Sequence, residues 1–106
     1  MNSGLRRIGH YELDMRMLRL YYVCNMRRIE VRRLSFREAC ILDMLISAEE
    51  EIVDNQRLLD ELWGDNTLYT HNSLYVFISR LKQYLAQDDT IIIQNIRGKG
   101  YRLIKR

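Results

Sequence analysis

One stretch of the chain carries side chains that could recognise another molecule through hydrogen bonds. Residues 74–85, LYVFISRLKQYL, place apolar side chains at helical spacing on one stripe, namely Leu74, Ile78, Leu81 and Leu85. The opposite face of this predicted helix is polar and carries Asn72, Ser79, Arg80 and Gln83, with Val76 at its centre. A single exposed apolar residue is common and by itself indicates no function. The alternative is that this face contacts a partner that offers both methyl groups and hydrogen-bonding edges.

Basic side chains are concentrated toward the C-terminus, although the net charge is only +3. Between residues 38 and 65, nine acidic residues accompany a single basic one, Arg57. Between residues 71 and 106, seven basic residues accompany two acidic ones, Asp88 and Asp89. This asymmetry favours a face directed at a polyanion, with a solvated charged tail as the alternative.

Length and composition exclude several classes of protein. A chain of 106 residues, of which 47% are hydrophobic, is predicted to form one globular domain. No apolar run is long enough to span a bilayer and the N-terminus lacks the apolar segment of a signal peptide, so we expect a cytoplasmic protein. Cys24 and Cys40 are far apart and far from the two histidines, which predicts free thiols and no metal or other cofactor.

Catalysis is not expected either. The sequence suggests no Ser/His/Asp or Cys/His constellation for nucleophilic catalysis and no glycine-rich loop that would cradle a phosphate. The GKG of residues 98–100 lacks the strand–loop–helix context of a Walker motif and indicates a hairpin turn.

The elements that must position these residues follow from periodicity and capping. IGHYELD, MLRLYYV and RRIEVRRL alternate as three strands of an antiparallel meander. Ser35 and Glu38 form a capping box for a first helix that ends near Ser47. A very short strand at Ile52 and Val53 then precedes a second helix. That helix has Asp54 as its N-cap, runs from about Asn55 to Trp63 and is ended by Gly64.

A loop, DNTLYTH, leads to the third helix, which we predict over residues 71–86 with Thr70 as its cap. Residues 91–104 then change to a strand period around the glycine-containing turn RGKG, which predicts a β-hairpin with a basic tip. The predicted fold class is α+β: a meander, three helices and a closing hairpin.

Two helices joined by a loop and followed by a basic hairpin are the parts of a winged helix-turn-helix. In that arrangement the second helix enters the major groove of DNA and the hairpin, or wing, reaches the adjacent minor groove. Phosphates require cations, base edges require Arg, Asn, Gln or Ser, and a thymine methyl requires an apolar neighbour. Val76 would then be the methyl contact, which gives its position on a polar face a purpose.

The whole pattern resembles the OmpR/PhoB-type winged-helix DNA-binding output domains of bacterial two-component response regulators. The matching segments stand in the family's order: LSFREACILDMLI (34–46), VDNQRLLDELWGD (53–65), NSLYVFISRLKQYL (72–85) and NIRGKGYRLIK (95–105). The resemblance extends from about Ile8 to Lys105, and ISRLK, RGKGYRL and LWGD are its most specific parts. It implies sequence-specific binding of double-stranded DNA for transcription regulation, at the end of a phosphorelay.

Carried over position by position, the resemblance implies a DNA-binding surface. Its expected residues are Trp63, Thr70, Asn72, Tyr75, Val76, Ser79, Arg80, Lys82, Gln83, Asn95, Arg97 and Lys99. Arg80 is the expected phosphate or base contact near the groove centre, and Arg97 is expected to enter the minor groove. Trp63 either is a core residue that ends a helix or also touches a phosphate through its indole N–H. The segment that this family presents to RNA polymerase corresponds to Asp65, Asn66, Thr67, Leu68 and Tyr69.

Three positions depart from the family's usual pattern, so a target sequence cannot be transferred from a relative. Asn72 stands where arginine is frequent, Tyr75 where an acidic residue or asparagine is frequent, and Phe77 where histidine is frequent. Tyr75 could stack on a base, donate a hydrogen bond or only cover the edge of the core.

The resemblance also implies partners. Full regulators carry an N-terminal receiver domain, which does not fit in this chain. We therefore expect residues 1–7 to be a linker remnant and residues 8–106 to be the DNA-binding domain, and we favour an excised output domain over a stand-alone protein. Binding as a dimer or in tandem on DNA and contact with RNA polymerase are expected. The rival is a winged-helix module that binds protein or RNA, against which the cations Arg80, Lys82, Arg97 and Lys99 argue.

Overall fold

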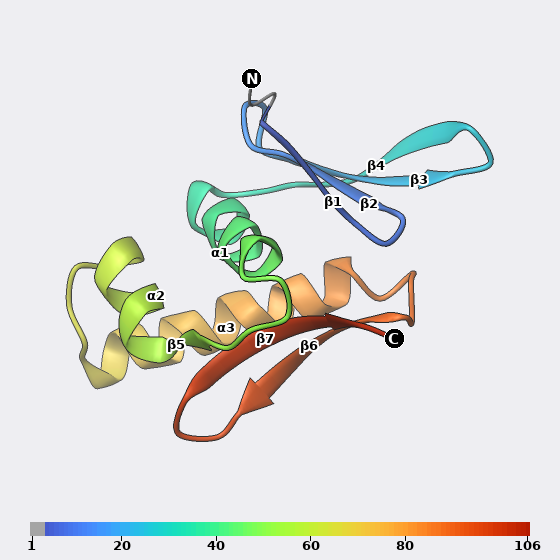
Figure 1. The fold of residues 1–106 in the computed structure, drawn as a ribbon. Helices are drawn as coiled ribbons and strands as arrows, with labels where there is room; N and C mark the ends of the chain where they lie inside the picture. Colours follow the sequence, from blue (N-terminus) through green and yellow to red (C-terminus); the bar gives the residue numbers. More distant parts are fainter. Residues whose placement is uncertain (1–3) are drawn as a thin grey trace.

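The computed structural model describes residues 4–106. Its described part contains three helices and two small β-sheets, which lie around the helices (Figure 1). The N-terminal sheet consists of β1 (Leu5–Ile8), β2 (Tyr11–Asp14), β3 (Arg19–Cys24) and β4 (Arg27–Arg33). The remaining elements are α1 (Phe36–Ser47), β5 (Val53–Asp54), α2 (Asn55–Leu62), α3 (Leu68–Tyr84), β6 (Ile91–Ile96) and β7 (Gly100–Lys105). The predicted α+β winged helix-turn-helix fold is therefore confirmed.

The N-terminal sheet is an antiparallel meander in the order β1-β2-β3-β4. Three strands were expected, but the sheet has four, so this number is wrong. The segment IGHYELD is not one strand: a turn separates Ile8, the last residue of β1, from Tyr11, the first residue of β2, and the two residues pair with each other. Gly9 in this turn has φ +57°, and a Cβ there would lie 2.7 Å from Oδ2 of Asp88, so only glycine fits. β1 begins at Leu5, inside the segment that we assigned to the linker, and residues 1–3 of that segment lie outside the described part.

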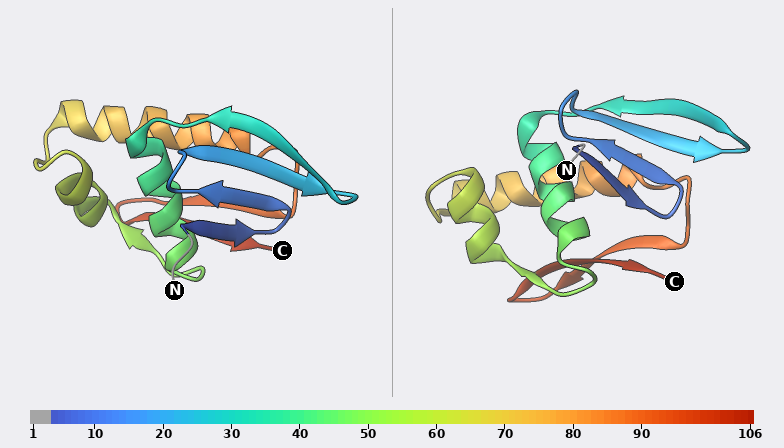
Figure 2. Two further views of the ribbon diagram at one scale, coloured as in Figure 1. Left: turned by 90° about the horizontal axis from the view of Figure 1, so that it is seen from above. Right: turned by 45° about the horizontal axis from the view of Figure 1, so that its top comes forward.

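Helix α1 lies between the two halves of the molecule. The predicted capping box is present: Ser35 Oγ accepts from the Glu38 N–H at 3.1 Å, and Glu38 Oε1 accepts from the Ser35 N–H at 2.8 Å. The helix contacts β1 and β2 on one side and α3 and β7 on the other (Figure 2). Its buried residues Ile41, Leu42 and Leu45 therefore form the centre of the core.

The third helix begins three residues earlier than predicted and ends two residues earlier. Its N-cap is Thr67, not Thr70: Thr67 Oγ1 accepts from the Thr70 N–H at 3.2 Å, and Thr70 Oγ1 accepts from the Thr67 N–H at 2.9 Å. Thr70 thus has the role of the glutamate in a capping box. The predicted core stripe is confirmed, since Leu74, Ile78, Leu81 and Leu85 are buried. Helix α2 ends as predicted, with Gly64 at φ +75° just after Trp63, whereas Asp54 occupies the N-cap position without a side-chain hydrogen bond.

The predicted hairpin is β6–β7, and β5 adds a third strand in the order β5-β7-β6. The Lys99 N–H donates to the Ile96 carbonyl at 2.9 Å, and Gly98 has φ +75°, which closes the tight turn at the tip. A Cβ on Gly100 would lie 2.0 Å from the Val53 carbonyl oxygen, so this glycine allows β5 to approach. The Asn55 N–H donates to the Lys99 carbonyl at 2.9 Å, which ties the hairpin tip to the start of α2.

Candidate nucleic-acid interface

Helix α3 presents the exposed polar face that its periodicity predicted. Tyr75 is 61% exposed and Val76 is 46% exposed, and Asn72, Arg80, Lys82 and Gln83 are exposed as well, whereas Ser79 is half-buried. The apolar stripe on the opposite side is packed against α1 and the C-terminal sheet, which fixes the direction of this face. Val76 is thus an exposed methyl-bearing side chain among hydrogen-bonding ones.

The wing lies along one side of α3. A groove of about 380 Å³ separates the first turns of α3 from the hairpin tip, and it is lined by His71, Gly98 and Lys99 together with residues of α2. Further along, Tyr75 is close to Tyr101 of β7. Burial raises the pKa of Tyr101, and the neighbouring Tyr75 raises it further. Asn95, Arg97 and Lys99 are exposed. The exposed face of α3 and the basic tip therefore form adjoining parts of one surface.

Hydrogen bonds hold the segment that joins α2 to α3. Asn66 Nδ2 donates to Gln56 Oε1, and Asn66 Oδ1 is bonded to His71 Nε2 of α3. Gln56 in turn donates to Asp60 Oδ1 at 2.8 Å. These bonds fix the angle at which α3 leaves the turn, and hence the direction of its exposed face.

The other side of α3 carries a row of aromatic rings and arginines. The rings of Trp63 and Phe77 lie 5.7 Å apart between centroids. The Cζ of Arg37 lies 4.8 Å from the Trp63 centroid, and the Cζ of Arg80 lies 5.4 Å from the Phe77 centroid. Such distances are those of cation–π contacts, which restrict the arginine side chains. Trp63 is half-buried and packs against the core, and its contact with a phosphate stays a prediction.

Some predicted site residues lie elsewhere than expected. The Thr70 side chain is buried and its hydroxyl takes part in the cap of α3, so it supports the helix from inside. Leu68 and Tyr69, assigned to the loop before the helix, belong to the first turn of α3 and are 79% and 76% exposed. Of that segment, Asp65, Asn66 and Thr67 form the connection itself and are exposed.

Two further arginines lie beside this face, and the sequence did not predict their positions there. Arg32 lies at the end of β4 and Arg37 in the first turn of α1, and both are exposed. Their proximity to Tyr84 and Trp63 depends on how the N-terminal sheet packs against the helices, which no local pattern reveals. The only available signal was the abundance of arginine in the N-terminal third.

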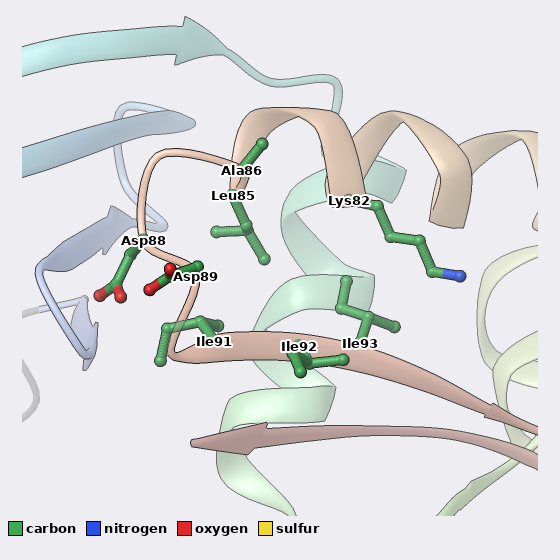
Figure 3. A pocket seen from close by; sticks show the side chains of 8 residues that line it. All are labelled: Lys82, Leu85, Ala86, Asp88, Asp89, Ile91, Ile92 and Ile93. Atoms are coloured by element: carbon green, nitrogen blue, oxygen red, sulfur yellow. The ribbon is translucent and has the colours of Figure 1, made fainter. Parts of the chain in front are cut away.

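A second groove, between the end of α3 and β6, is mostly apolar (Figure 3). Its volume is about 400 Å³, and Leu85, Ile91 and Ile93 are among its lining residues. Lys82 lies at one end and the carboxylate of Asp88 at the other (Figure 3). Hydrogen bonds from the hydroxyl and N–H of Thr90 and from the N–H of His10 lower the pKa of Asp88, although burial opposes them. The Asp88 carboxylate is therefore engaged in hydrogen bonds that hold the segment between α3 and β6.

The described residues contain no cluster of three or more histidine, cysteine, aspartate or glutamate side chains that could hold a metal ion. Cys24 and Cys40 are free and half-buried, as predicted, and burial raises the pKa of the Cys40 thiol. Within residues 4–106 no helix has both the length and the apolar character needed to cross a membrane.

Comparison with protein families decides the affiliation of the chain. The family model described as "Transcriptional regulatory protein, C terminal" matches residues 30–103, which include all three helices and most of the wing. The chain belongs to this family. The predicted affiliation with OmpR/PhoB-type output domains is thereby confirmed.

Curated relatives of this C-terminal regulatory domain are response regulators and other transcriptional regulatory proteins. The transcriptional regulatory protein RprY of Bacteroides fragilis is 36% identical over 72 residues, which cover 68% of this chain and 30% of the relative. The response regulator protein GraR of Staphylococcus epidermidis is 38% identical over 69 residues, or 64% of this chain and 31% of the relative. The chain thus spans about a third of the length of the relatives that it matches.

Solved structures with the same fold include DNA-binding domains of response regulators. The RstA DNA-binding domain of Klebsiella pneumoniae, solved in complex with the RstA box, has a TM-score of 0.73 and 25% identity, and the match covers 94% of this chain and 96% of that one. The AdeR DNA-binding domain, solved in complex with an intercistronic region, has a TM-score of 0.75 at 21% identity, with 98% and 100% covered. At that identity the second likeness concerns the fold alone.

Proposed function

We propose that this domain binds double-stranded DNA sequence-specifically and thereby regulates transcription, as the output domain of a two-component response regulator. Helix α3 lies in the major groove and the β6–β7 wing in the adjacent minor groove. The observation that carries this proposal is the exposed face of α3 with Asn72, Val76 and Arg80, which a wing tipped by Arg97 and Lys99 flanks on one side.

The groups on α3 match the chemistry of a major groove. Arginine can donate two hydrogen bonds to guanine, and asparagine or glutamine can pair with adenine. Arg80, Asn72 and Gln83 supply these groups, and Val76 supplies the apolar contact for a thymine methyl. Tyr75 is exposed beside the wing, where a base contact through its ring or its hydroxyl is available.

The wing supplies charge and shape recognition. Arg97 and Lys99 stand on a turn held by the Lys99–Ile96 hydrogen bond, so their side chains project from a fixed base. Narrow, A·T-rich minor grooves concentrate negative potential and attract arginine. Arg97→Ala should therefore weaken binding most for sites with A·T-rich flanks. Equal losses on A·T-rich and G·C-rich flanks would indicate a plain phosphate contact.

Further partners belong to the same proposal. We infer that a receiver domain precedes this domain in the complete regulator, because the match covers only about a third of the length of relatives with response-regulator names. The exposed Leu68 and Tyr69, with Asp65, Asn66 and Thr67, are suited to contact RNA polymerase. We also infer that the domain binds DNA as a dimer or in tandem and that the protein is cytoplasmic.

Selection of bound oligonucleotides from a random duplex pool tests the proposal. We expect a single consensus, and Arg80→Ala should abolish its enrichment. If the domain prefers single-stranded or double-stranded RNA over every DNA duplex, the rival RNA-binding function is correct. If it retains no nucleic acid at low salt, a protein-binding module is the better interpretation.

A further inference from the structure

Two arginines from the N-terminal half of the chain lie beside α3 on the side away from the wing. The Cζ of Arg37 lies 4.8 Å from the centroid of Trp63, and the Cζ of Arg32 lies 5.3 Å from the ring centroid of Tyr84. Both arginines are exposed. The wing, in contrast, meets α3 along the side of His71 and Tyr75.

A helix in the major groove has phosphates on both of its sides, because the groove is only about 12 Å wide. The wing cations serve one of these sides. We propose that Arg32 and Arg37 bind DNA phosphates on the other side of α3. This inference rests on the proposed function and adds to it a second row of backbone contacts, supplied by β4 and α1.

Arg37 is held in a position that leaves its phosphate-binding groups free. Its Nε donates to the Leu62 carbonyl at the end of α2, at 2.9 Å, and its guanidinium stacks over Trp63. The two terminal nitrogens then remain to donate a pair of hydrogen bonds, the geometry that suits a phosphate. Because the side chain is already restrained, less conformational entropy is lost on binding.

Arg32 lies over a ring that is itself fixed. The Tyr84 hydroxyl donates to Glu38 Oε2 at 3.0 Å, and Glu38 Oε1 accepts from the Ser35 N–H. Glu38 is buried at the start of α1 and its other oxygen is held in the capping box, so the Tyr84 ring cannot swing away without breaking its hydrogen bond to a fixed carboxylate. Arg32 therefore has a rigid surface beneath it.

The carboxylates near these arginines are already engaged. Both oxygens of Glu38 accept hydrogen bonds, from Ser35 and Tyr84. Glu61 lines the same groove as Arg37, but it forms an ion pair with Arg57 at 3.2 Å. The positive charges of Arg32 and Arg37 thus remain available to bind a phosphate.

The test compares Arg32→Ala, Arg37→Ala and the double variant with Arg27→Ala. Arg27 is an exposed arginine at the tip of the β3–β4 hairpin, which projects from the body of the molecule (Figure 1), and its loss changes the net charge equally. Binding to the selected duplex and to an unrelated duplex is titrated at several salt concentrations. Each single variant should make the slope of log K against log salt shallower by about one, and the double variant by about two, while Arg27→Ala changes neither slope.

The ratio of the two affinities should stay unchanged, because phosphate contacts carry no base information. Arg37→Lys and Arg32→Lys should restore most of the slope. Should Arg37→Ala fold poorly, Arg37→Gln keeps a donor for Leu62 and still removes the charge. The inference is overturned if the wild type binds with a steep slope and the double variant has the same slope as Arg27→Ala. The proposed function would still stand in that case. No binding of any duplex by the wild type would instead contradict the proposed function itself.

Discussion

At the residue scale, the guanidinium of Arg80 is the most consequential group of the interface. It lies on the exposed face of α3 and is restrained by the Phe77 ring. Arg80→Ala should reduce specific affinity by about 2 to 3 kcal/mol, since a charge-assisted contact to a base or phosphate is lost. Binding of unrelated duplex should change much less if the contact is to a base. A uniform loss on both duplexes would identify Arg80 as a phosphate contact.

Val76 offers a test at the level of one methyl group. The wild type should prefer thymine over uracil at one major-groove position of its selected site, because uracil lacks the methyl group that Val76 would contact. Val76→Ala should weaken this preference and leave overall affinity within a few fold. Titration of thymine-substituted and uracil-substituted duplexes measures it. If no position distinguishes the two bases, Val76 is an ordinary exposed residue.

The exposure of Val76 could be predicted from the sequence, whereas the positions of Arg32 and Arg37 could not. Helical periodicity alone decides which side of α3 faces the core. The two arginines reach α3 only because the N-terminal sheet and α1 pack as they do, and such packing depends on contacts between residues far apart in the chain.

At the element scale, the start of α3 depends on Thr67. Its hydroxyl accepts from the Thr70 N–H, so Thr67→Ala should reduce the free energy of unfolding by about 1 kcal/mol. Thr67→Ser keeps the hydroxyl and is the matched control. Both are compared in urea or thermal unfolding. Equal stability of the alanine and serine variants would mean that water or another group satisfies this helix end.

This cap also shows why one boundary was predicted and another was not. Ser35 is followed three residues later by Glu38, the usual signature of a capping box, and α1 begins where that signature indicates. Thr67 is followed three residues later by another threonine and not by glutamate or glutamine, so the usual signature is absent and the sequence favours Thr70 as the cap. In the meander, the two-residue turn at Gly9 and His10 was missed because alternation continues on both sides of it.

At the scale of the whole molecule, Asp88 joins the N-terminal sheet to the segment between α3 and β6. Its carboxylate accepts from Thr90 and from the His10 N–H of the β1–β2 turn. These bonds lower its pKa below the ordinary value of 3.8, so the stabilisation is complete above that pH and is lost as the pH falls through the lower folded-state pKa. Asp88→Ala should cost about 1 to 3 kcal/mol near neutral pH. The difference from wild type should shrink below pH 3.8, and a difference independent of pH would rule out the charged carboxylate as its source.

The central claim, that this domain reads DNA sequence with α3 while cations hold the backbone, is tested most directly by one titration. The selected duplex and a scrambled duplex of the same composition are titrated over a range of salt concentrations. The selected duplex should bind at least about a thousandfold more tightly. Four cations on α3 and the wing predict a slope of roughly −3 to −4 for log K against log salt, and Arg32 and Arg37 would bring it to about −5. Equal affinity for the two duplexes, or a response that is flat in salt, would contradict the account.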